Sequence, residues 1–64
     1  MKPRKKAIEL LNKSGYHFKR RGSNHDIYYN DRVGSLIPLK RHDFDEDDLL
    51  YIQKEIKHND QGEK

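Results

Sequence analysis

The residues best suited to chemistry lie in the stretch "RRGSNHDIYY" at positions 20–29. It combines two arginines, a turn of small polar residues and one histidine, namely Arg20, Arg21, Gly22, Ser23, Asn24 and His25. Arginine guanidinium groups bind phosphate oxygens, and an imidazole can accept and donate protons near neutral pH. This combination favours a site in which a phosphodiester is held by cations beside a proton-transferring His25.

His25 also has a structural interpretation. If Ile27 faces the core, His25 shares that face by the two-residue period of a strand and lies at its rim. A histidine at such a position often has only a packing role. The spacing alone therefore leaves both interpretations open.

A second basic group, Lys40, Arg41 and His42, follows the last strand-like segment and could contact a phosphate. His17 and His58 are expected to be surface residues. The acidic run at 45–48 is not expected to hold a metal, because consecutive helix positions point in different directions. We therefore expect no metal and no cofactor.

Charge divides the chain into two halves. The chain has 64 residues, 31% hydrophobic and 39% charged, with a net charge of +3. Eleven Lys and Arg stand against three acids up to Arg41, and three Lys against eight acids from His42 onward. This polarity indicates a basic surface that attracts a polyanion. With no cysteine, no membrane span and no apolar run behind "MKPRKK", a cytoplasmic protein is expected.

Hydrophobic periodicity predicts five elements in a single domain. A helix begins at Pro3 and closes at Gly15, strands follow over 16–20, 25–29 and 33–39, and Asp45 caps a helix that ends at His58. Asp48 completes a capping box with Asp45. The expected core stripes are Ala7, Ile8 and Leu11 in the first helix and Leu49, Leu50, Ile52 and Ile56 in the last. Tyr16 and Phe18 share one face of the first strand, and Tyr28 and Tyr29 point to opposite faces, so that one of the pair is expected in the core.

The short turns between the strands predict an antiparallel meander. The fold class is therefore α+β, in the order α-β-β-β-α, with a three-stranded antiparallel sheet and two helices on one face. Residues 1–58 form the domain and residues 59–64 a flexible tail.

The stretch "GSNHDIY", preceded by "LLNKSGYHFKRR" and followed by "IPLKRH" and a closing helix, resembles the HicA family of toxins. The resemblance runs from about Lys5 to His58. HicA proteins are small mRNA interferases of type II toxin-antitoxin systems with a fold like that of double-stranded-RNA-binding domains. The family's catalytic histidine stands at the head of the second strand, which corresponds to His25 here. Asn24 is an insertion between Ser23 and His25 relative to many members.

The resemblance implies a ribonuclease that cleaves single-stranded RNA or mRNA, inhibits translation and growth, and is neutralised by a HicB-type antitoxin. RNA carries its own nucleophile, the 2′-hydroxyl, so one imidazole that moves protons can produce a 2′,3′-cyclic phosphate without a metal. The cations and turn residues at 20–24 and 40–42 would hold the RNA backbone.

Two other functions remain open from the residues. The first is a non-catalytic RNA-binding module on the same scaffold. The second is a small interaction protein whose basic surface meets an acidic partner. A plain duplex-binding role is disfavoured, because the four acids at 45–48 would repel RNA from the start of the last helix.

Overall fold

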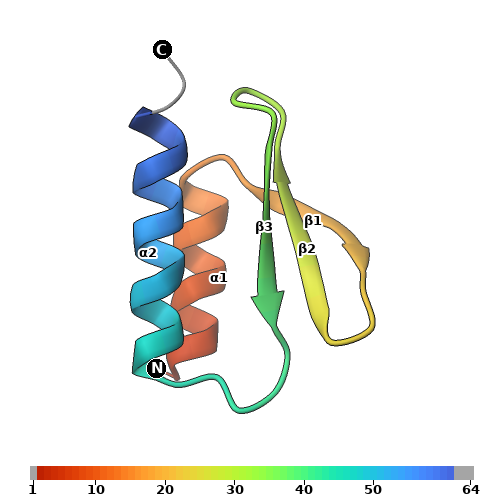
Figure 1. Cartoon of the computed structure of the whole chain (residues 1–64), viewed down its shortest axis with the longest axis vertical. Helices are drawn as coiled ribbons and strands as arrows, with labels where there is room; N and C mark the ends of the chain where they lie inside the picture. Colours follow the sequence, from red (N-terminus) through yellow and green to blue (C-terminus); the bar gives the residue numbers. More distant parts are fainter. Residues whose placement is uncertain (1, 62–64) are drawn as a thin grey trace.

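The structure, a computed structural model that describes residues 2–61, confirms the predicted order of helix, three strands and helix (Figure 1). The elements are α1 (Pro3–Lys13), β1 (His17–Arg21), β2 (His25–Asn30), β3 (Ser35–Lys40) and α2 (Glu46–Gln61). The strands lie in the order β1-β2-β3, and both pairings are antiparallel. The predicted α+β meander is therefore confirmed.

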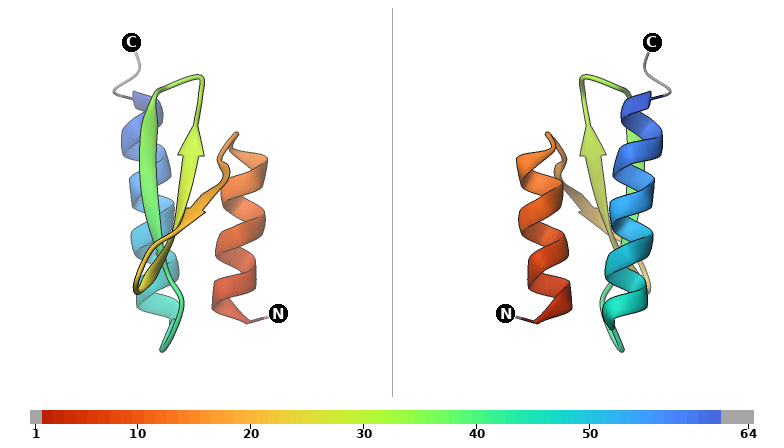
Figure 2. Two further views of the ribbon diagram at one scale, coloured as in Figure 1. Left: turned by 90° about the vertical axis from the view of Figure 1, so that its right-hand side faces the viewer. Right: turned by 90° about the vertical axis from the view of Figure 1, so that its left-hand side faces the viewer.

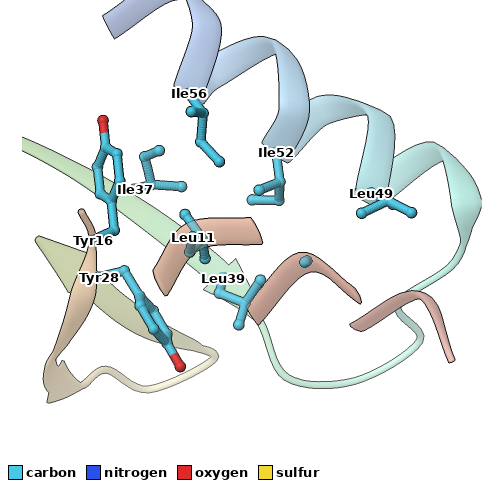
Figure 3. Close-up of a cluster of buried hydrophobic side chains, with 9 residues drawn as sticks. Leu11, Tyr16, Tyr28, Ile37, Leu39, Leu49, Ile52 and Ile56 are labelled. Atoms are coloured by element: carbon cyan, nitrogen blue, oxygen red, sulfur yellow. The ribbon is translucent and has the colours of Figure 1, made fainter. Parts of the chain in front are cut away.

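Both helices lie side by side against one face of the sheet (Figure 2). The core fills the space between the helices and the sheet. It comprises Ala7, Leu11, Tyr16, Tyr28, Ile37, Leu39, Leu49, Ile52 and Ile56 (Figure 3). We call the sheet face that points away from the helices the open face. Because the core is thin, polar contacts between elements matter for how the sheet is held.

A glycine with a left-handed backbone ends α1, as predicted. Gly15 has φ +94°, and Pro3 occupies the first turn, where its missing N–H costs nothing. A Cβ atom on Gly15 would lie 3.1 Å from the side-chain Nδ2 of Asn30. The turn after α1 is therefore packed directly against the end of β2.

Asn30 connects two turns through a buried side chain, a role that the sequence did not reveal. Its Nδ2 donates to the Ser14 carbonyl at 3.1 Å, and its Oδ1 accepts from the backbone N–H of Arg32 at 2.9 Å. Its side chain therefore joins the end of α1 to the turn between β2 and β3, which Gly34 closes with φ +68°.

Leu50, predicted in the core stripe of the last helix, is 52% exposed, and the aromatic Phe18 is 53% exposed. Phe18 lies on β1, an edge strand whose five residues are all exposed, and meets the ring of Tyr28 edge-on at 6.1 Å. Leu50 follows the buried Leu49 by about 100° around α2, so it points away from the core. Periodicity identified the core stripe of α2 but not its width.

The predicted capping box of α2 is present. The Asp45 N–H donates to Asp48 Oδ2 at 3.0 Å, and the Asp48 N–H donates to Asp45 Oδ1 at 3.1 Å. The helix continues to Gln61, past the predicted end at His58, and Asn59 Nδ2 donates to the Tyr16 hydroxyl at 2.9 Å. Residues 59–61 of the predicted tail are thus helical, and residues 62–64 lie outside the described residues.

We predict that Asn30→Ala lowers the free energy of unfolding by about 1–3 kcal/mol, because partly buried backbone groups at both turns lose their partner. Urea unfolding followed by circular dichroism measures this. Asn12→Ala, on the exposed side of α1, is the matched control and should cost little or nothing. Equal stability of the two variants would contradict the role assigned to Asn30.

Candidate functional site

His25 lies on the open face of the sheet. In β2 the buried residues are Tyr28 and Asn30, and Tyr28 is opposite the buried Ile37, whereas Ile27 is opposite the exposed Pro38. Ile27 therefore does not face the core, so the condition for the structural interpretation of His25 is not met. Since strand residues alternate between faces, His25 shares the open face with Ile27 and points away from the core.

A cavity of about 230 Å³ lies beside His25, where the sheet meets α2. Its walls come from β2, β3, the following link and α2, and the lining residues are His25, Pro38, Lys40, Phe44, Asp48, Tyr51 and Ile52. His25 is directly opposite Lys40 in the β2–β3 pairing. Within residues 2–61 its imidazole makes no hydrogen bond or ion pair, so both ring nitrogens are open to a ligand.

Lys40 is held at the cavity by Asp48. Their side chains form an ion pair, with Nζ 3.1 Å from Oδ2. The backbone hydrogen bond from Asp45, followed by the contact with Lys40, lowers the pKa of Asp48. Asp48 is therefore ionised at neutral pH and holds the Lys40 ammonium at the cavity that His25 also lines.

Arg41, predicted to contact RNA, is engaged within the protein. Its Nη1 lies 2.7 Å from Asp26 Oδ1, and its Nη2 donates to the carbonyl oxygens of Gly22 and Ser23. The side chain is only 13% exposed. The guanidinium thus fixes the β1–β2 turn and is not presented to a phosphate.

Asp26 binds a second arginine from α1, and this pair was not identified from the sequence. Arg4 Nη2 lies 2.8 Å from Asp26 Oδ2, and Arg4 Nε donates to the Lys40 carbonyl at 2.8 Å. Burial raises the pKa of Asp26, but the hydrogen bonds and charges of Arg41 and Arg4 outweigh it and lower the pKa below its ordinary value. Asp26 is therefore a charged anchor between α1, β2 and the link after β3.

The turn before His25 requires glycine. The Gly22 N–H donates to the His25 carbonyl at 2.7 Å, and a Cβ atom on Gly22 would lie 2.9 Å from that oxygen. The Asn24 carbonyl accepts from the Arg41 N–H at 3.3 Å. Gly22 therefore shapes the turn that presents His25, while the side chains of Ser23 and Asn24 are exposed.

The two arginines of β1 point to opposite faces. Arg20 is opposite Ile27 and shares the open face with His25, whereas Arg21 is opposite Asp26 and belongs to the helix side. Both side chains are exposed. His42 is exposed in the link after β3 and does not line the cavity. The structure thus brings Arg20 and Lys40 to the face of His25, whereas Arg21 lies on the helix side and His42 lies in the link after β3.

Further cationic and aromatic groups lie on the open face beyond those predicted. Lys19 Nζ lies 4.7 Å from the centre of the Tyr29 ring, and the His17 ring meets Tyr29 edge-on at 6.3 Å. The β1–β2 register shifts between Phe18 and Arg20. This irregularity hid the arrangement, because strict strand alternation assumes an unbroken register.

Residues 2–61 contain no group of three or more His, Cys, Asp or Glu side chains that could hold a metal ion. None of the helices in this part of the chain has both the length and the apolar character needed to span a bilayer. No family model matches the chain, and no curated protein or solved structure is significantly similar to it.

We predict that Asp26→Asn lowers the free energy of unfolding at pH 7 by about 1.5–3 kcal/mol, since two arginines lose their charged acceptor. Because the folded-state pKa of Asp26 is lowered, its contribution is complete above the ordinary value of 3.8 and is lost as the pH falls through the folded value. Urea unfolding at pH 7, 5 and 3 should show an equal gap between wild type and variant at pH 7 and 5, and a narrower gap at pH 3.

Asp31→Asn is the control for this experiment, because the Asp31 carboxylate is 80% exposed and lies 3.7 Å from His17. It should leave stability nearly unchanged at neutral pH. A gap between wild type and Asp26→Asn that stays constant from pH 7 to pH 3 would show that the ionised carboxylate is not the stabilising group.

Proposed function

We propose that the protein is a metal-independent endoribonuclease of the HicA type, an mRNA interferase toxin that acts in the cytoplasm and inhibits translation and growth. The observation that carries the proposal is the unpaired imidazole of His25, which lines the same cavity as Lys40 and is opposite it in the β2–β3 pairing. A histidine that is partly exposed and makes no hydrogen bond within residues 2–61 is suited to contact a ligand. The resemblance of "GSNHDIY" to the HicA motif supports the same residue.

The reaction needs proton transfer and charge stabilisation. His25 removes the proton from the 2′-hydroxyl, the O2′–P bond forms, and the P–O5′ bond breaks to leave a 2′,3′-cyclic phosphate. The imidazolium that results can return its proton to the leaving O5′. Lys40 stabilises the negative charge that develops on the phosphoryl oxygens, while Arg20 binds the neighbouring backbone on the same face.

The open face also suits a protein partner. Lys19, Arg20 and Lys40 make it basic, and within residues 2–61 only the link after β3 and α2 approach it, at the cavity. A HicB-type antitoxin with acidic or apolar groups that covered this face would bury His25 and block access to RNA. Neutralisation would then be steric and electrostatic.

We predict that His25→Ala lowers the rate of RNA cleavage by about 10²- to 10⁴-fold without loss of fold. Purified protein is incubated with single-stranded RNA in EDTA, and the products are analysed for 2′,3′-cyclic phosphate ends. His58→Ala, an exposed histidine of α2 outside the cavity, is the control and should cleave like wild type. Circular dichroism checks that each variant folds.

Induced expression gives the cellular readout for the same proteins. Wild type and His58→Ala should arrest growth and His25→Ala should not. Equal cleavage by wild type and His25→Ala would overturn the catalytic assignment, and a strict need for magnesium would overturn the metal-independent reaction. If wild type, His25→Ala and His58→Ala all bind RNA and none of them cleaves it, a non-catalytic RNA-binding module is favoured.

A further inference from the structure

Tyr51 is an exposed aromatic residue that neither the core nor the proposed reaction explains. It lies on α2 next to the buried Ile52, yet it is 50% exposed and lines the cavity that contains His25 and Lys40. Its phenol has no hydrogen bond within the described part of the chain. An aromatic ring that is not needed for packing, placed beside a candidate catalytic group, is suited to contact a ligand.

The cavity lining combines apolar and polar side chains. Pro38, Phe44, Tyr51 and Ile52 supply apolar or aromatic surface, and His25, Lys40 and Asp48 supply polar groups. A flat ring with polar edges matches this lining better than an aliphatic group does. Proteins that bind single-stranded RNA place unstacked bases on aromatic side chains in this way.

Charge decides which part of a nucleotide goes where. Asp48 contributes a carboxylate from α2 and pairs with the Lys40 ammonium, so a phosphate that binds Lys40 must approach from the sheet side, away from that carboxylate. On the sheet side, Lys40 and Arg20 share the open face with His25, and the acid of β2, Asp26, belongs to the opposite face. The phosphodiester therefore belongs on the sheet side and the uncharged base on the α2 side.

We propose that Tyr51 is the stacking platform for one base of single-stranded RNA, and that this contact places the adjoining phosphodiester against His25 and Lys40. The proposal rests on the proposed ribonuclease function for its substrate. It assigns Tyr51 to substrate binding and leaves proton transfer to His25.

The test measures binding in the His25→Ala background, where RNA is not cleaved. In that background Tyr51→Ala should lower the affinity for a short single-stranded RNA by about 5- to 150-fold at fixed salt. Tyr51→Phe should retain the affinity, because it keeps the stacking ring. Leu50→Ala is the matched control: Leu50 is the neighbouring residue, equally exposed at 52%, and does not line the cavity.

Two further readouts separate stacking from electrostatics. Tyr51→Ala should leave the salt dependence of binding unchanged, whereas Lys40→Ala should reduce its slope by about one phosphate contact. An RNA that carries a single abasic nucleotide should bind equally well to the His25→Ala protein with and without the Tyr51→Ala substitution when the missing base is the one that stacks.

Equal RNA affinity of Tyr51→Ala and Leu50→Ala would overturn the proposal, and so would loss of affinity in Tyr51→Phe. Neither result touches the assignment of His25, which the cleavage assay of the wild type tests separately. A Tyr51 effect on binding by a protein that cleaves no RNA would support the base site and reject the ribonuclease. Absence of measurable RNA binding would overturn both.

Discussion

The carboxylate of Asp26, held between Arg4 and Arg41, is the interaction on which the arrangement of the site depends. It joins α1 to β2 through one arginine and the link after β3 to β2 through the other. Arg41 extends the connection to the carbonyl oxygens of Gly22 and Ser23 in the turn before His25. In a domain with so small a core, this polar cluster fixes where the sheet, the turn and the first helix meet.

The same cluster divides the basic residues into two groups. Arg4 and Arg41 form ion pairs with Asp26 that hold the fold together. Lys19, Arg20 and Lys40 lie on the open face, which also carries His25 and Tyr29. Two acids at the start of α2 also have structural roles. Asp45 and Asp48 cap the helix, and Asp48 in addition forms the ion pair with Lys40. The net charge of +3 therefore does not show that basic side chains are concentrated on the open face.

Under the proposed function, binding and chemistry are shared between layers. The sheet supplies His25, Lys40 and Arg20 to the phosphodiester, and α2 supplies Tyr51 to the base. A substrate that spans β3 and α2 would make both sets of contacts at once. Contacts away from the reacting bond would then orient the RNA, so that a single imidazole is enough for proton transfer.

The sequence by itself determined the elements and several of their ends, because these depend on local features: the apolar periods of the helices, Gly15 after α1, and the capping box of Asp45 and Asp48. It also singled out His25 and the basic residues near it. Only the tertiary structure decided that Ile27 and His25 lie on the open face, that Arg41 is paired with Asp26, and that Tyr51 lines the cavity. These depend on strand register, a break in the β1–β2 pairing and contacts between residues far apart in the chain, none of which local periodicity specifies.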